Sequence, residues 1–227
     1  MSKLLYKEFR LCMQPLVLIF FLFVLMLLIP SYPYTIMGFF ICNGLFYSFT
    51  QSIADNDTLF TLLLPVSKKD AVRGKLWFML LVQLALVVLC VPLMFVNHAM
   101  FPEGNPAGVD ATLSLLGGLF VLFSLFNASF LPKFYRNPTK NGRNFLISAV
   151  LCFAWIIVFD GVMIAANAAQ EFVPAFSWIE THLDRYPTCV EEWLTQGIFL
   201  VVCIGIFAAS SEWTFRRSVR AFDGADL

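Results

Sequence analysis

The sequence predicts an all-α integral membrane protein with six transmembrane helices, and three observations lead to this fold class. Hydrophobic residues make up 59% of the 227 residues and charged residues only 13%, whereas about a quarter of the residues in soluble domains are charged. The run from Leu16 to Ile29 contains no polar residue. Five further apolar runs follow, each near the roughly 20 residues that cross a bilayer. We therefore expect a chain that crosses the membrane repeatedly.

The first ten residues predict a helix that lies along the membrane surface before the first span. Lys3, Lys7 and Arg10 alternate there with apolar residues, which is typical of a basic amphipathic helix at an interface. Beyond this elbow helix we expect one transmembrane domain over residues 1–227. Its spans are predicted at about 11–29, 36–54, 76–96, 111–131, 145–166 and 193–213.

The basic residues predict which way the chain is threaded. Fourteen of the 15 Lys and Arg residues lie in residues 1–10, in 55–75, in 133–143 or after the sixth span, and only Arg185 falls elsewhere. Six spans place these four segments on one side, and Lys and Arg are enriched in cytoplasmic loops. We therefore expect a multi-pass protein of the cell membrane with both termini in the cytoplasm.

The segment from Asp55 to Lys75 is too long and too charged for a simple turn between two spans. Its pattern predicts a short helix capped by Asp55 or Asp57, a break at Pro65, and a second helix that begins with a capping box of Ser67 and Asp70. Leu59 and Phe60 belong to an apolar middle with charges on both sides. Such a segment predicts an interfacial or docking element.

A second basic segment, with Lys133, Arg136, Lys140 and Arg143, precedes the fifth span as a compact loop. Two explanations fit the positive charge of both segments. The cations contact lipid headgroups and fix the topology, or they form a docking surface for another protein.

The stretch LLLPVSKKDAVRGK resembles the cytoplasmic loop of type-2 ABC exporter permeases, in which an acidic residue, a short helix and an LPVSR-like motif precede the third span. Small six-span members export phenol-soluble modulins and peptide antibiotics. The resemblance implies helical cytoplasmic coupling loops and a short external helix before the last span. It assigns ATPase coupling to Asp55, Asp57, Leu59, Phe60, Pro65, Ser67, Lys68, Lys69, Asp70, Arg73, Lys133 and Arg136.

The resemblance also implies partners. Two separate ATPase subunits would bring ATP and Mg, a second copy or a sister permease would complete the path, and an amphipathic or hydrophobic cargo would leave by alternating access. This chain needs no cofactor of its own, and we expect no nucleic acid among its partners. Gly74-Lys75 is not a P-loop, because Lys69 and Leu76 replace the required Gly and Ser or Thr. We therefore do not expect this chain to hydrolyse ATP.

Asp160 is the most unusual residue of the predicted spans, because a charged side chain in hydrocarbon costs a few kcal/mol or more (about 3 on insertion scales). We expect an amide partner from among Asn43, Gln83, Asn127 and Asn167. Asn43, Gln83, Asn127 and Asp160 either line a translocation path or bond helices to one another, and the sequence leaves both open.

Other features predict structure. Gly117 and Gly118 favour close helix packing in the fourth span. Phe172, Phe176, Ile179 and Leu183 recur at helical spacing and predict a short outer helix. The six cysteines and two histidines show no metal-ligand spacing, so we expect neither a metal site nor a disulfide framework.

Two alternatives to a permease remain from the sequence. One is an intramembrane lipid-modifying enzyme that uses Asp160 and a headgroup-binding basic loop, although the cytoplasmic acids are scattered. The other is a membrane scaffold.

Overall fold

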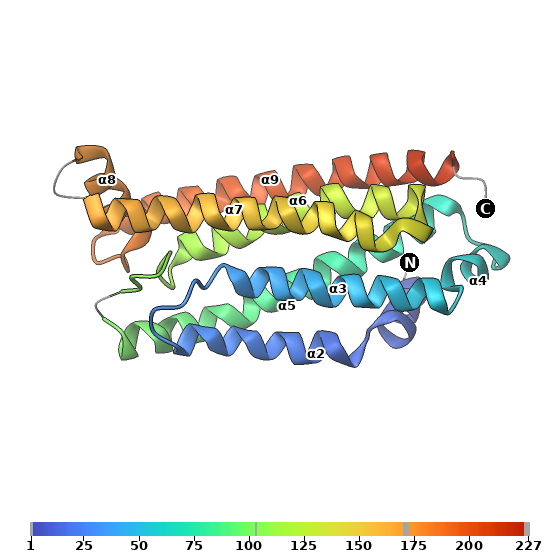
Figure 1. Cartoon of the computed structure of the whole chain (residues 1–227), viewed down its shortest axis with the longest axis horizontal. Helices are drawn as coiled ribbons and strands as arrows, with labels where there is room; N and C mark the ends of the chain where they lie inside the picture. The colour runs from blue at the N-terminus through green and yellow to red at the C-terminus, as the bar shows by residue number, and fades with distance from the viewer. Residues whose placement is uncertain (1, 103, 170–172, 225–227) are drawn as a thin grey trace.

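The computed structural model describes residues 2–102, 104–169 and 173–224 of the chain. Every regular element within these ranges is a helix, and the long helices run side by side along the long axis of the molecule (Figure 1). Both chain termini and α4 lie at one end of this bundle, which we call the terminal end. The opposite end carries α8 and is called the far end.

The first predicted span begins with the expected elbow. Helix α1 (Ser2–Lys7) continues into a π-helical turn, η1 (Glu8–Cys12), and the chain then enters α2 (Pro15–Phe21) and the 3-10 helix η2 (Leu22–Leu28). The axis turns by 81° between Leu4–Arg10 and Pro15–Leu28. Pro15 occupies the first turn of α2, where its missing N–H leaves no hydrogen bond unmade.

The segment after α3 (Ile36–Ala54) has the predicted order of helix, break and helix. Helix α4 (Asp57–Leu63) ends before Pro65, and α5 (Lys68–Met100) follows. The Ser67 hydroxyl accepts a bond from the Asp70 N–H at 3.1 Å, as the predicted cap requires. The prediction that Asp55 or Asp57 caps α4 was wrong. Asn56 precedes α4 with a left-handed φ of 52° and no side-chain cap, since Asp57 is engaged by lysines.

The second half of the chain contains α6 (Leu113–Arg136), η3 (Pro138–Lys140), α7 (Asn141–Ala169), α8 (Pro174–Ile179), η4 (Glu180–Asp184) and α9 (Val190–Asp223). Helix α6 continues through Pro132, so Lys133 and Arg136 lie on its last turn and not in the loop that the sequence predicted. The predicted outer helix exists as α8 and η4, which carry Phe176, Ile179 and Leu183. Phe172 lies outside the described residues.

Helix α6 is the centre of the bundle and packs along α9 and α7. A Cβ atom on Gly117 would lie 2.7 Å from a ring carbon of Phe199, and one on Gly118 would overlap the ring of Phe159. Only glycine lets these aromatic rings approach the α6 backbone, which confirms the predicted close packing.

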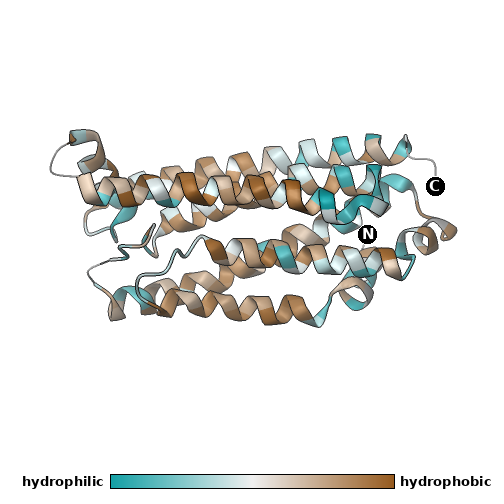
Figure 2. Cartoon of the chain, in the orientation of Figure 1, coloured by the Kyte–Doolittle hydropathy of each residue, from teal (hydrophilic) through white to brown (hydrophobic). Residues whose placement is uncertain are grey.

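By length and composition, four described helices can cross a membrane: α5, α6, α7 with η3, and α9. The bent pair that ends in η2 raises the number to five. Helix α3 has 19 residues and coincides with the second predicted span, but it is not among these candidates. Hydropathy is highest along the middle of the bundle, and hydrophilic residues gather at the terminal end (Figure 2).

Candidate functional site

Four charged side chains form a buried cluster at the terminal end. The Lys75 ammonium lies 2.9 Å from Asp57 Oδ2 and 3.2 Å from Glu8 Oε2, and it donates to the Ser52 hydroxyl at 2.7 Å. The Lys7 ammonium lies 2.7 Å from Asp57 Oδ1 and 3.1 Å from Glu8 Oε1. We call Lys7, Glu8, Asp57 and Lys75 the terminal ion cluster.

The terminal ion cluster is electrically balanced and nearly dry. Its side chains are between 2% and 13% exposed. Moving an ion out of water costs about 3 kcal/mol or more, and only complete pairing of the charges offsets this cost. Burial alone would raise the pKa of Asp57, but Lys75 and Lys7 together lower it to about 2. The Asp57 carboxylate is therefore ionised at neutral pH.

The cluster joins segments that are far apart in the sequence. Glu8 comes from η1, Asp57 from the first turn of α4 and Lys75 from α5. The Lys7 ammonium also donates to the Thr61 hydroxyl of α4 at 2.6 Å. The elbow, α4 and the start of α5 are thus held as one unit.

Sequence reasoning placed Asp57 in the coupling set but missed Lys7, Glu8 and Lys75. A signal was present, because Glu8 is the only acid among the basic residues of the elbow and Lys75 directly precedes a long apolar run. Glu8, Cys12 and Asp57 also come close enough to hold a metal ion. Both carboxylates, however, already accept bonds from the lysine ammonium groups, so the geometry is that of an ion-pair cluster.

Helix α4 and the residue that ends it also expose apolar side chains. Leu63 is 85% exposed, and Leu59, Phe60 and Leu64 are also exposed. We call these four residues the α4 apolar row. Asp57 and Thr61, which are four residues apart, face the ion cluster. Helix α4 is therefore fixed by ion pairs and hydrogen bonds at Asp57 and Thr61 while these four apolar side chains stay exposed.

A groove of about 230 Å³ runs beside α4. It is lined by Ser52, Ile53, Asn56, Thr58, Leu59, Phe134, Tyr135, Pro138 and Phe222. The end of α9 closes one side, because Lys68 donates to the Phe222 carbonyl at 3.3 Å and its ammonium lies 5.2 Å above the Phe222 ring. Residues from the ends of α3, α4, α6 and α9 thus share one surface with the α4 apolar row.

The other predicted coupling residues serve separate contacts. Asp55 accepts a bond from Gln51 at 2.9 Å, and Arg73 lies 5.1 Å above the Phe215 ring. Lys69 and Pro65 are exposed. Lys133 and Arg136 line a different groove, together with the end of α9.

The structure does not gather the predicted path residues into one channel lining. Gln83 and Asn127 are completely buried and exchange two hydrogen bonds of 2.8 Å between α5 and α6. Asn43 is half-buried on α3. The Asp160 Oδ1 atom accepts a bond from the Thr35 hydroxyl at 2.6 Å. The prediction of an amide partner for Asp160 was therefore wrong.

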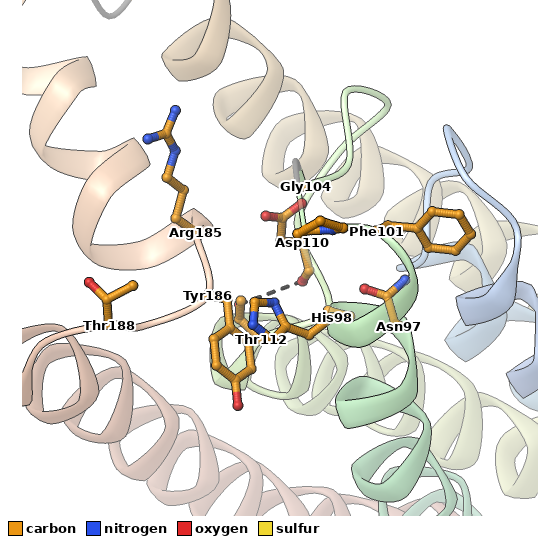
Figure 3. A pocket seen from close by; sticks show the side chains of 11 residues that line it. Asn97, His98, Phe101, Gly104, Asp110, Thr112, Arg185, Tyr186 and Thr188 are labelled. Carbon is orange, nitrogen blue, oxygen red and sulfur yellow. Dashed lines mark hydrogen bonds between the residues drawn. The ribbon is translucent and has the colours of Figure 1, made fainter.

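A polar pocket of about 490 Å³ opens at the far end, between the end of α5 and the start of α9 (Figure 3). Asp110 and Arg185 line it, and His98 stacks on Tyr186 with ring centroids 3.6 Å apart. Behind it, Asp184 Oδ1 accepts a bond from the Asp110 N–H at 2.9 Å. The two acids lie 74 residues apart in the sequence, and no local pattern indicates that they meet.

Burial raises the pKa of both acids behind this pocket. For Asp110 burial raises the pKa to about 6, against the lowering effects of the Asn105 N–H and of Arg185. For Asp184 burial, reinforced by the nearby Asp110 carboxylate, raises the pKa to about 7. These acids can therefore change charge near neutral pH.

Comparison with known proteins gives one match. The family model described as ABC-2 family transporter protein matches residues 3–216, which include every helix from the elbow to most of α9. No curated protein and no solved structure matches the chain.

Proposed function

Because the chain belongs to the ABC-2 family of transporter proteins and is a membrane permease component without an ATPase domain, we propose that it exports an amphipathic or hydrophobic cargo with energy from ATPase subunits that dock on α4. An ABC permease implies such ATPase partners, and ATP and Mg would bind there. The family match favours this function over the lipid-modifying enzyme and the scaffold.

The orientation that we propose places the terminal end in the cytoplasm. The elbow, the start of α5, the end of α6 with η3 and the start of α7, and the end of α9 carry all Lys and Arg residues except Arg185. Such residues concentrate on the cytoplasmic side. Both termini lie at this end (Figure 1), which agrees with an even number of crossings. The chain crosses the membrane six times if α3 is one span and the bent helix pair that ends in η2 is another.

The α4 apolar row is the observation that carries the docking proposal. Exposed Leu and Phe side chains at a hydrophilic end of a membrane protein mark a surface that another molecule covers. The terminal ion cluster joins α4 to the elbow and to α5, so a force on the row moves the three as a unit. Lys133 and Arg136 line a separate groove with the end of α9 and do not belong to this dock.

Helix α5 supports transmission from the dock across the membrane. It runs for 33 residues from its Ser67 cap to Met100, a length of about 50 Å at 1.5 Å per residue. Lys75 anchors its first turns to α4, and Asn97 near its other end lines the far-end pocket. We propose that displacement of α4 tilts α5 and opens the bundle alternately to each side.

A groove between α5 and α9 supports the cargo class. It holds about 410 Å³, and its walls include Leu80, Leu84 and Phe207, while Arg73 and Glu212 line its edge nearest the terminal end. An apolar wall with charges at one edge suits an amphipathic molecule that arrives from the membrane. We propose that a second copy or a sister permease completes the path, because one bundle of this size encloses no wide channel.

The dock is tested by Leu59→Ser combined with Leu63→Ser in the complex with the partner ATPase. Both side chains are exposed, so the free energy of unfolding should change by about 0.5 kcal/mol or less. The ATP hydrolysis that the permease stimulates should fall at least tenfold, since the apolar contact is lost. The rate of hydrolysis in proteoliposomes measures this effect.

Val190→Ser is the matched control, because Val190 is as exposed as Leu63 (84% against 85%) but begins α9 near the far end. Its stimulated hydrolysis should equal that of the wild type. Unchanged hydrolysis in the α4 double variant would remove the basis for the dock.

A further inference from the structure

Four basic side chains converge on a groove at the terminal end that the transport proposal does not use. Lys133 and Arg136 come from the last turn of α6, and Arg217 and Arg220 come from the last turns of α9. With Pro132, Ala221 and Gly224 they line a groove of about 310 Å³. We call it the basic groove.

The basic groove lies on a different side of the α6–α9 contact from α4. Arg217, Arg220, Ala221 and Gly224 stand at helical spacings of three, four and seven, so they share one face of α9. Phe222 points away from this face and packs on Tyr135, with ring centroids 4.7 Å apart. That pair borders the groove beside α4. The two grooves are therefore separate surfaces.

The basic groove has positive charge, and among the residues that the structure describes no carboxylate lines it. In the described part of the chain, the cations in ion pairs are Lys7, Lys75, Arg185 and Arg216, and none of these lines the groove. Lys133 donates to the Ser129 hydroxyl at 2.9 Å, and the Arg217 guanidinium lies 4.9 Å above the Trp213 ring. Like charges this close together repel, so an anion that enters the groove is stabilised.

The surroundings of the groove indicate which anion fits. Trp213 is half exposed one turn before Arg217, and Trp is enriched where a membrane meets water. Ile206 and Val202 continue the same exposed face of α9 toward the middle of the bundle. A molecule with its phosphate in the groove would thus lay its hydrocarbon chains along an apolar face.

We propose that the basic groove binds the headgroup of an anionic phospholipid from the leaflet on the terminal side. Basic pockets at the ends of membrane helices recognise such headgroups, with each Lys or Arg contributing about fivefold to affinity. The bound lipid would offset part of the positive charge of the groove and brace the end of α9 against α6. The site is independent of the α4 dock, so it can fail while the transport proposal holds.

The test measures lipid retention by the full chain in detergent micelles with native mass spectrometry. The chain is titrated with dioleoyl-phosphatidylglycerol, with the zwitterionic dioleoyl-phosphatidylcholine, and with inorganic phosphate as a soluble anion. Arg136→Gln combined with Arg217→Gln removes one cation from each wall of the groove. Lys140→Gln combined with Arg216→Gln is the matched control, because it removes the same charge at the same end from outside the groove.

The wild type should retain phosphatidylglycerol in preference to phosphatidylcholine. Its affinity for phosphatidylglycerol should fall roughly 30-fold in R136Q/R217Q and by less than about threefold in K140Q/R216Q. Equal losses in the two variants would show a general charge effect and overturn the site. Displacement of the lipid by an equal concentration of inorganic phosphate would also overturn the site. The same holds for an R136Q/R217Q chain that keeps the lipid but no longer binds the ATPase subunit.

Discussion

Lys75 shows how much one buried charge determines at the residue scale. Its ammonium contacts carboxylates from η1 and α4 and the Ser52 hydroxyl of α3. A single lysine thus fixes the position of the elbow and of the proposed docking helix. Because a buried ion is stable only while its partners are present, this position should be sensitive to any loss of charge balance.

Lys75→Met tests the terminal ion cluster. The substitution leaves Glu8 and Asp57 with Lys7 as their only cation, so the free energy of unfolding should fall by about 3 kcal/mol or more. Adding Asp57→Asn restores a balanced pair of Lys7 and Glu8 and should recover part of that loss. Denaturant unfolding in detergent micelles measures both changes.

Lys69→Met provides the control, because Lys69 is exposed on the first turn of the same helix. The substitution should lower the free energy of unfolding by no more than about 0.5 kcal/mol. A K75M chain as stable as the wild type, or a K75M/D57N chain no more stable than K75M, would contradict the proposed charge balance.

The raised pKa of Asp184 predicts how the stability of the chain depends on pH. Its pKa is about 7 in the folded chain and about 3.9 when unfolded, so the folded state binds the proton more tightly. Stability should therefore fall as pH rises from about 4 to about 7. Asp184→Asn keeps an acceptor for the Asp110 N–H and removes the charge, which should raise stability at pH 8 by roughly 2 to 4 kcal/mol.

Melting temperatures from pH 4 to pH 8 check this prediction. The D184N profile should be flatter than that of the wild type, with the remaining slope due to Asp110. Asp223→Asn, on the exposed end of α9, should leave the profile unchanged. A wild type that gains stability from pH 5 to pH 8 would contradict the buried, raised-pKa state of Asp184.

At the scale of elements, the sequence predicted helices better than it predicted their ends and contacts. Apolar runs predicted α3 with its observed bounds, and the Pro65 break and the Ser67 cap predicted the α4–α5 boundary. The end of α6 was missed because Pro132 usually interrupts a helix, yet α6 continues through it.

Contacts between elements were harder to predict, because they depend on how helices come together in space. Lys7 and Asp57 are 50 residues apart, and no local pattern pairs them. Gln83 and Asn127 were predicted either to line a path or to bond helices to one another, but the sequence did not identify them as partners. The sequence indicated Leu59 and Phe60 of the α4 apolar row as apolar residues of this segment. Only the structure shows that the side chains of the row are exposed.

Gly118→Ala tests the packing of α6 against α7. A methyl group there overlaps the Phe159 ring, so the ring must move and the free energy of unfolding should fall by about 1 to 3 kcal/mol. Gly161→Ala on α7 meets no atom within 4 Å and should be neutral or stabilising by up to about 1 kcal/mol. Equal thermal stability of the two variants would contradict the close contact.

At the scale of the whole molecule, the two ends of the bundle carry different kinds of sites. The terminal end holds the ion cluster, the α4 apolar row and the basic groove, while the far end holds a polar pocket above two acids that titrate near neutral pH. Helix α5 connects them. The proposed function gives this division a purpose, because an exporter driven by ATPase subunits at the terminal end would release its cargo at the far end.

The most direct test of the account places a photo-crosslinking phenylalanine analogue at position 63 of the full chain in native membranes and identifies the product by mass spectrometry. We expect a crosslink from position 63 to a subunit that carries a P-loop, and none from the same analogue at position 190. A crosslink from position 63 to lipid alone, or to a protein outside the cell, would contradict the proposal that α4 receives the force that drives export.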